Sequence, residues 1–231
     1  MSSVPGESPK QRTRIPLSRE RILRAALEMA DGAGLEALTM RALGQALGVE
    51  AMSLYNYVED KEDLLTGMVE LVLAEIDLAP IAHDWRLDMR ATALSAYGAL
   101  LRHPWACRLV LSPTSPGMIA ARMTYIESIL ARLRHTGITP EAASRAYHAI
   151  DSHILGFTIW QLGHELPADA PADFVATLMR QLDSGVFPYL TEHAGVHMKA
   201  SEGEEEGEFE FGLELILDGL ERYVTGGGGG I

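Results

Sequence analysis

Residues 39–61, TMRALGQALGVEAMSLYNYVEDK, constrain the fold of this chain more than any other segment. They read as two short helices joined by a tight turn, followed by the start of a third helix. Thr39 can cap the first helix, and Leu38 before the cap can pack on Leu43 inside it. Gly48 lies where the chain must reverse, a place that favours a positive φ. The segment therefore predicts a helix–turn–helix.

The second of these helices is expected over residues 51–58, with short or polar side chains directed outward. Gly44 lies one turn before the reversal, where a small residue lets two helices cross closely. A helix that carries Ala51, Met52 and Ser53 on its outer face and is held rigidly by its neighbour fits a DNA major groove. The alternative is an ordinary helical hairpin inside a bundle.

The flanking residues complete a three-helix unit. Residues 17–22, LSRERI, contain a helix start with Ser18 as the cap, and that helix is expected to end at Gly32 or Gly34. Asp60 can cap the following helix, whose first turn is acidic and therefore favoured by the helix dipole.

The rest of the chain shows helical periodicity and no strand pattern, so the predicted fold class is all-α. Proline-rich and glycine-containing breaks separate the segments. Helices are expected over residues 61–78, 85–102, 104–111, 118–134, 140–165, 172–184 and 206–224.

Residues 17–224 resemble the tetracycline-repressor (TetR) family of transcriptional regulators. The N-terminal resemblance lies in residues 38–41, 48–50, 53–55, 61 and 64–65, and the C-terminal resemblance in residues 101–105, 154–157 and 209–216. It implies a helix–turn–helix DNA-binding domain over residues 17–66 and a regulatory, ligand-binding and dimerisation domain over residues 67–225. A basic arm (1–16) and a glycine tail (226–231) are expected at the ends.

Chemistry and resemblance together indicate the residues that would contact operator DNA. These are Thr39, Arg41, Ala51, Met52, Ser53, Tyr55, Asn56, Tyr57 and Lys61. Arg41 can pair with guanine, Asn56 with adenine or a phosphate, and the apolar Ala51 and Met52 with a thymine methyl group. Lys61 can hold a phosphate. The tetracycline repressor has Gln-Pro where this chain has Ala51-Met52, which implies a different operator.

Two helices carry stripes suited to close pairing. Small residues recur every three or four positions along residues 142–156, and apolar residues do so along residues 209–220. Such stripes commonly form the core of a single chain, whereas the resemblance implies a homodimer built from these helices. The expected interface residues are Ala146, Ala149, Ser152, Gly156, Phe209, Leu213, Ile216, Leu217 and Leu220. Two copies would read half-sites roughly 34–36 Å apart.

The resemblance also implies a small organic effector whose binding releases the repressor. The candidate lining residues are Trp105, Arg108, Met118, Arg122, Tyr125, Tyr147, Asp151, Trp160 and Gln161. The ligands that hold tetracycline and magnesium in the tetracycline repressor have no counterpart here. Residues 70–78 contain no histidine, and Val110 and Leu111 occupy the expected place of the key loop histidine. Neither tetracycline nor a metal is therefore expected.

Net charge alone would argue against a nucleic-acid partner, because the chain carries −13 at pH 7. The charge is uneven, however: residues 10–24 contain six Lys and Arg against one acid, and much of the excess acid lies in residues 202–210. No apolar run approaches the length that spans a bilayer, so no membrane partner is expected. A cytoplasmic location fits the single Cys107, which excludes an internal disulfide. This cysteine reads as a small buried hydrophobe; as a redox sensor it would lack a resolving partner.

Two other classes of function fit the sequence less well. His148, Asp151 and His153 share a helix, but the chain lacks the paired Glu-x-x-His motifs of a bundle di-metal site, a nucleophile elbow and a phosphate-binding glycine loop. No catalytic residue or cofactor is therefore expected. A helical module that binds protein rather than DNA is the remaining alternative, and salt-dependent binding to a duplex would distinguish the two.

Overall fold

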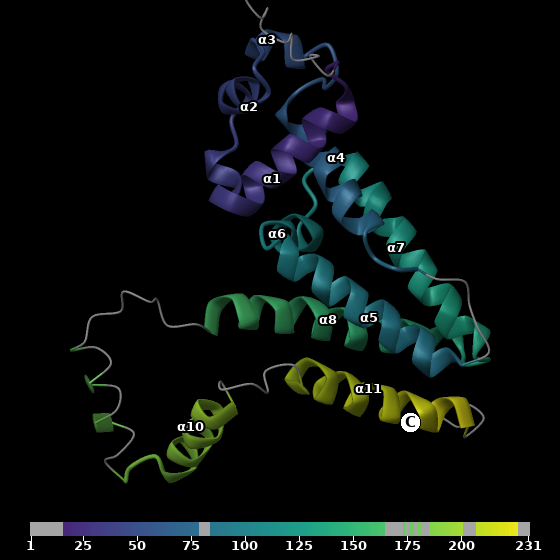
Figure 1. Cartoon of the computed structure of the whole chain (residues 1–231). Coiled ribbons are helices and arrows are strands. Elements are labelled where there is room, and N and C mark those ends of the chain that lie inside the picture. Colours follow the sequence, from purple (N-terminus) through teal and green to yellow (C-terminus); the bar gives the residue numbers. More distant parts are fainter. Residues whose placement is uncertain are drawn as a thin grey trace, which may run out of the picture. The chain divides into compact units, whose positions relative to one another are not determined.

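The computed structural model describes residues 16–78, 84–164, 173, 176–177, 180–181, 185–200 and 207–225 (Figure 1). Every regular element among these residues is a helix, as the all-α prediction requires. The chain divides into two compact units, residues 1–68 and 69–231, with the boundary inside one helix. The expected arm (1–16) lies almost entirely outside the described residues, and the glycine tail lies wholly outside them.

The first unit contains α1 (Arg19–Ala37), α2 (Met40–Leu47), α3 (Ala51–Leu54) and the start of α4 (Lys61–Ala74). Ser18 caps α1 by accepting a hydrogen bond from the backbone N–H of Arg21 at 3.2 Å. The helix breaks at Gly34, one of its two expected ends, and resumes after that kink as far as Ala37. Apolar side chains from all four helices are completely buried and form the core, among them Ile22, Leu38, Leu43, Leu54 and Leu64.

The turn between α2 and α3 has the predicted geometry. Thr39 Oγ1 accepts from the Ala42 N–H at 3.1 Å, and Gly48 has a φ of 70°. A Cβ atom on Gly44 would lie 3.0 Å from the Val49 carbonyl oxygen and 3.1 Å from the Ala51 nitrogen. Glycine at this position therefore lets α3 approach α2 closely.

Helix α3 is shorter than expected, since it ends at Leu54 rather than at residue 58. The N–H groups of Tyr57 and Val58 both donate to the Leu54 carbonyl, which tightens the chain into a turn. This turn carries Val58 into the core, where only 2% of it is exposed. Burial of Val58 and the start of α4 thus override the helical periodicity of the segment.

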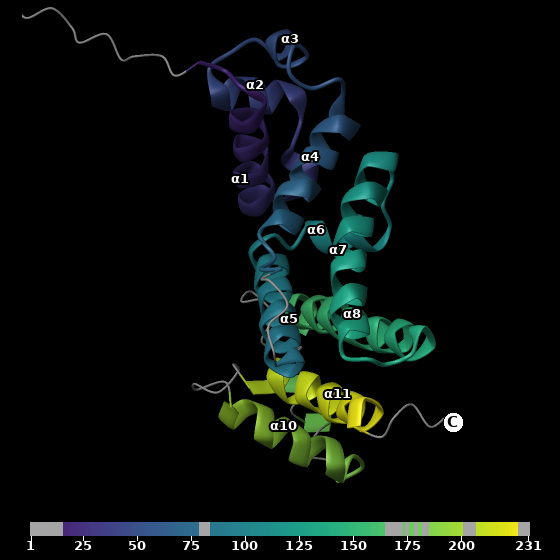
Figure 2. The ribbon, with the colours of Figure 1, turned by 90° about the vertical axis from the view of Figure 1, so that its right-hand side faces the viewer.

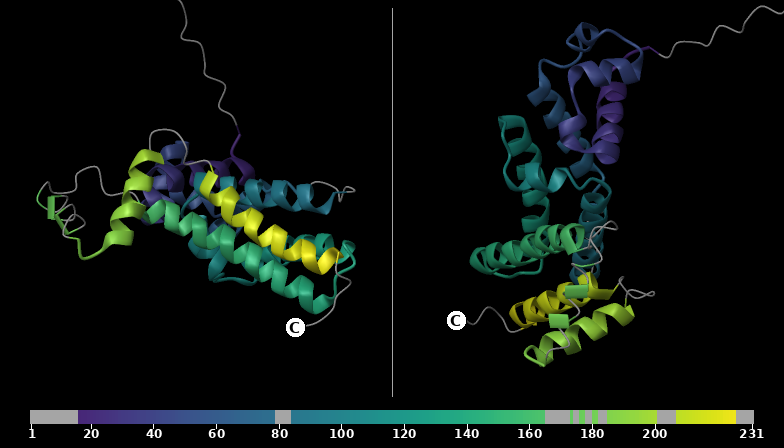
Figure 3. Two further views of the ribbon diagram at one scale, coloured as in Figure 1. Left: turned by 90° about the horizontal axis from the view of Figure 1, so that it is seen from below. Right: turned by 90° about the vertical axis from the view of Figure 1, so that its left-hand side faces the viewer.

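The described residues of the second unit form the end of α4 and then α5 (Trp85–Arg102), α6 (Ala106–Leu111), α7 (Pro116–His135), α8 (Pro140–His164), α10 (Pro188–Ala200) and α11 (Glu208–Thr225). Helix α8 is central and contacts α5, α6, α7 and α11, with α7 crossing it (Figure 2). Helix α11 lies along α8 with α5 beside it (Figure 3). Most of these helices begin and end close to the predicted residues.

Two predictions about this unit are wrong. Helix α4 ends at Ala74, not at residue 78, because the N–H groups of Glu75 and Ile76 bond three residues back and that of Asp77 donates to Ser95 Oγ at 2.8 Å. Helix α10 was not anticipated, although Pro188 at its first position is a helix-start signal. The helix expected over 172–184 lies largely outside the described residues, as does the break over 79–84.

The apolar stripe of α11 belongs to the core of the chain rather than to a surface. Phe209, Leu213, Leu217 and Leu220 are buried within the single chain, and so is Ala146 of α8. The Tyr97 ring of α5 stacks on Phe209 at 4.0 Å. These side chains pack within one chain, so little of their surface is free to contact a second copy.

Other residues of the predicted interface remain accessible. Ala149, Ser152 and Gly156 are exposed on α8, and Ile216 is half-buried on α11. Two large apolar side chains that the stripe did not include, Phe211 and Leu215, are 68% and 59% exposed on α11.

Candidate DNA-binding and effector sites

The residues expected to contact DNA lie at the start of α2, on α3, in the turn after α3 and at the start of α4. All nine are exposed or half-buried, and Met52 is 75% exposed. Asn56 Nδ2 makes only a long bond, 3.4 Å, to the Ser53 carbonyl. Their side chains are thus accessible to a partner, while their backbone is fixed by the buried neighbours Leu54 and Val58.

An ion pair holds the turn that carries Tyr55, Asn56 and Tyr57. The Arg19 guanidinium donates to both carboxylate oxygens of Asp63 at 2.7 Å and also to the Tyr57 carbonyl at 3.0 Å. Asp63 in turn accepts from the Glu59 N–H at 2.9 Å. The hydrogen bonds from Arg19 hold the pKa of Asp63 below its ordinary value of 3.8. Both ends of the turn are therefore tied to α1 and α4.

The cations of the first unit differ in what surrounds them. Arg19 is paired with Asp63, and Arg24 with Glu20 at 2.9 Å. Within the described residues, neither Arg41 nor Lys61 has a recorded ion pair, and both are exposed. A lysine at a helix N-terminus is opposed by the helix dipole. Lys61 therefore adds nothing to the stability of α4 through the helix dipole.

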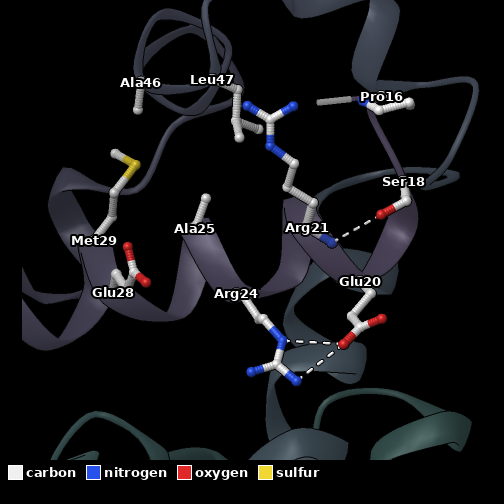
Figure 4. A pocket seen from close by; sticks show the side chains of 10 residues that line it. All are labelled: Pro16, Ser18, Glu20, Arg21, Arg24, Ala25, Glu28, Met29, Ala46 and Leu47. Carbon is white, nitrogen blue, oxygen red and sulfur yellow. Dashed lines mark hydrogen bonds and ion pairs between the residues drawn. The ribbon is translucent and has the colours of Figure 1, made fainter. Parts of the chain in front are cut away.

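The unit as a whole is not basic. Residues 1–68 contain ten Asp and Glu against eight Lys and Arg, which gives a net charge of −2. A surface hollow between α1 and α2 shows the same balance (Figure 4). Arg21 and Arg24 line it together with Glu20 and Glu28, and Ser18 and Glu20 are already engaged by hydrogen bonds. This hollow therefore offers no concentrated charge to a ligand.

The second unit contains a small cavity between the end of α4 and helices α5, α6, α7 and α8. Its lining residues are Leu73, Ile76, Ala96, Leu100, Val110, Arg122, Tyr125, Asp151, Ile154 and Leu155. The cavity has a volume of about 240 Å³, and the free space within it is enough for only about one water molecule. An organic ligand therefore requires the walls to move apart.

The polar part of this cavity is an ion pair between α7 and α8. Arg122 Nη2 donates to Asp151 Oδ2 at 2.7 Å, and the Tyr147 hydroxyl donates to the same oxygen at 3.2 Å. Burial, and after it the Asp151 charge, raises the pKa of both Tyr125 and Tyr147. Both hydroxyls are therefore neutral, and the cluster carries one balanced pair of charges.

Only part of the predicted effector site comes together. Arg122, Tyr125 and Asp151 line the cavity, and Tyr147 reaches it through Asp151. The remaining five residues do not line it: Trp105 and Met118 are buried elsewhere, Arg108 and Trp160 are exposed, and Gln161 is half-buried.

Sequence reasoning missed the apolar wall of the cavity, which includes Leu73 of α4 and Ile76 in the segment just after it. The end of α4 is also clamped by polar contacts. Arg102 Nη2 and His103 Nε2 lie 2.7 and 3.1 Å from the Glu75 carboxylate. Burial alone would raise the pKa of Glu75, but these hydrogen bonds outweigh it and lower the pKa below 4.5.

The remaining predictions concern chemistry that the chain was not expected to perform. Cys107 is buried, and burial raises the pKa of its thiol. Among the described residues, no group of three His, Cys, Asp or Glu could hold a metal ion. None of the described helices combines the length and apolar character needed to cross a bilayer.

Comparison with known proteins covers both units. Residues 22–68 match the model of bacterial regulatory proteins of the tetR family, and residues 79–224 match the tetracyclin repressor-like C-terminal domain. The chain is 31% identical to the HTH-type transcriptional repressor DrrR1 of Streptomyces coeruleorubidus, over 95% of this chain and 83% of the relative.

Two solved structures from Streptomyces coelicolor are also similar. A TetR-type transcriptional regulator has a TM-score of 0.70 at 28% identity, over 91% of this chain and all of that one. ActR in complex with actinorhodin has a TM-score of 0.68 at 26% identity, with the same coverage of both chains.

Proposed function

This chain belongs to the TetR family of bacterial transcriptional regulators, and on that premise we propose that it is a repressor released from DNA by a small organic effector. Two copies bind a near-palindromic operator in the cytoplasm, and the effector occupies the cavity beside Arg122 in each. Regulation of transcription rather than catalysis is the function of this family.

One observation carries the coupling between effector and DNA. Leu73, which lines the cavity, stands on the helix that begins at Lys61, and Ile76, which also lines it, lies two residues after that helix ends. Because the cavity has room for only about one water molecule, an effector must displace its walls, α4 included. The effector thus favours a conformation in which α4 is shifted, and operator affinity falls as that conformation becomes populated.

We assign base contacts to Arg41, Ser53, Asn56 and the apolar Ala51–Met52 pair, and phosphate contacts to Lys61, Thr39 and the two tyrosines. Arg41 and Lys61 can engage DNA without breaking an ion pair recorded among the described residues. Each additional phosphate contact makes the slope of log affinity against log salt concentration more negative by about 0.9.

Dimerisation is assigned to the exposed faces of α8 and α11. Small residues on α8 (Ala149, Ser152 and Gly156) permit close helix approach, and Phe211 and Leu215 of α11 supply apolar area. A homodimer also explains how a four-residue recognition helix becomes specific, since two copies read both halves of a palindrome.

The test is a selection of bound sequences from random duplexes, followed by affinity measurement at two salt concentrations. Arg41→Ala should weaken binding to the selected operator by about 1–3 kcal/mol and relax the base preference at one position in each half-site. Arg108→Ala, which removes an exposed charge of α6 in the second unit and lies off both the DNA-binding and the dimer faces, is the matched control and should leave affinity unchanged. Failure to select any sequence would refute DNA binding and favour a protein-binding module.

A further inference from the structure

Arg122, which lines the cavity in the second unit, carries a buried hydrogen-bond donor that no described residue uses. Arg122 Nη2 is bonded to Asp151, but Nη1 of the same guanidinium is buried and has no partner among the described residues. A buried donor left in this state costs free energy, so a ligand that supplies an acceptor removes that cost.

Charge balance decides which kind of acceptor fits. Asp151 already neutralises Arg122, and the raised pKa values of Tyr125 and Tyr147 keep both hydroxyls uncharged. A ligand carboxylate would add an unbalanced negative charge beside Asp151, and a ligand cation would meet the Arg122 charge. Burying an unbalanced charge is far costlier than burying a hydrogen-bonded neutral group.

We propose that the effector is a neutral, largely apolar molecule whose carbonyl oxygen accepts a hydrogen bond from Arg122 Nη1. Ketones, quinones, lactones and amides share this chemistry. The apolar remainder packs against Leu73, Leu100, Val110 and Leu155. The inference rests on the proposed function in one respect, namely that this cavity is the effector site.

Because the cavity is nearly filled, the test begins by making room in it. Leu100→Ala removes a buried side chain from the wall, and an apolar cavity enlarged in this way can bind a single aromatic ring. Three probes of nearly equal shape are then compared: acetophenone carries a carbonyl oxygen, α-methylstyrene has a methylene in its place, and benzoate carries a negative charge. Affinities are measured by ligand-detected NMR.

The first comparison isolates the hydrogen bond. The quantity compared is the ratio of Kd for α-methylstyrene to Kd for acetophenone. This ratio should be at least about tenfold larger in Leu100→Ala than in Leu100→Ala/Arg122→Met/Asp151→Asn. The reason is that the triple variant has lost the charged donor that binds the acetophenone oxygen. Taking the ratio in both backgrounds cancels the different hydration of the two probes. Asparagine at position 151 keeps an acceptor for the Tyr147 hydroxyl.

The second comparison isolates charge balance. Leu100→Ala/Asp151→Asn leaves Arg122 without its counter-charge, so benzoate should gain about tenfold or more relative to acetophenone. If the Arg122–Asp151 pair had a purely structural role, the affinity for benzoate relative to acetophenone would not change. If Leu100→Ala does not fold, Leu155→Ala enlarges the same cavity from α8.

Equal ratios in the two backgrounds, preference for benzoate while Asp151 is intact, or no binding of acetophenone would each overturn the proposal. Selection of operator duplexes by the wild-type chain is measured in parallel. Successful selection with a failed probe test refutes only the carbonyl chemistry, whereas failed selection refutes the proposed function itself.

Discussion

Replacing Asp63 by asparagine should loosen the turn after the recognition helix without disturbing the second unit. The wild-type carboxylate receives two bonds of 2.7 Å from Arg19 and one of 2.9 Å from the Glu59 N–H. Asparagine keeps one acceptor but loses the charge and the bidentate geometry. Because the pair is only partly buried, with 42% of Arg19 and 26% of Asp63 exposed, the expected loss is about 1–2 kcal/mol.

Glu62→Gln is the matched control. It removes a carboxylate from the same first turn of α4, so both variants change the helix-dipole interaction and the charge near DNA alike. Only Asp63→Asn removes the pair with Arg19. Amide hydrogen exchange at Glu59 should therefore accelerate in Asp63→Asn and not in Glu62→Gln.

Two probes separate the units in a urea titration. All three tryptophans, Trp85, Trp105 and Trp160, lie in the second unit, so their fluorescence follows that unit alone, whereas circular dichroism follows both. Asp63→Asn should shift the circular-dichroism transition more than the fluorescence transition. Equal stability of Asp63→Asn and Glu62→Gln would refute the reasoning.

The same pair predicts a pH dependence. Since the folded pKa of Asp63 lies below the unfolded value of 3.8, the stabilisation is fully present above pH 3.8 and is lost as the pH falls through the folded pKa. The difference in stability between wild type and Asp63→Asn should therefore shrink in acid.

Three further substitutions or reactions test other parts of the structure. Gly212→Ala places a Cβ 2.4 Å from the His153 ring and breaks the hydrogen bond between that ring and the Phe209 carbonyl. Urea denaturation should therefore show that the free energy of unfolding falls by about 1–3 kcal/mol. Gly219→Ala, with open space around it, is the control and should be neutral or stabilising. Gly48→Ala forces a left-handed φ on alanine and should destabilise the first unit by about 1–2 kcal/mol in circular-dichroism denaturation, with weaker operator binding. Cys107 should react with a thiol reagent at pH 8 only after unfolding, because burial raises the pKa of its thiol. Rapid reaction of the folded chain would contradict the description of Cys107 as a buried, unreactive side chain.

Local signals in the sequence predicted local structure well. The caps at Ser18, Thr39 and Asp60 and the left-handed turn at Gly48 depend on residues within four positions, and each forms as expected. The end of α3 did not follow local periodicity because distant partners decide it: Val58 is drawn into the core, and Arg19 of α1 binds the turn.

The cavity proposed for the effector was harder to predict for the same reason. Aromatic and polar residues such as Trp160 of α8 and Arg108 of α6 look suited to a ligand, but both are exposed and neither lines the cavity. Leu73 of α4 and Ile76 just after it carry no signal of function, yet they form part of the wall. Periodicity identifies which residues share a face, whereas it does not identify which faces meet.

The paired arginines of the first unit have a consequence for how the protein would search a chromosome. With Arg19 and Arg24 engaged by carboxylates and a net charge of −2 over residues 1–68, we expect only modest attraction to arbitrary DNA. Most molecules would then be free rather than retained on the large excess of unrelated sequence. Fewer copies per cell would suffice to occupy the operator, and each copy released by an effector would leave the chromosome quickly.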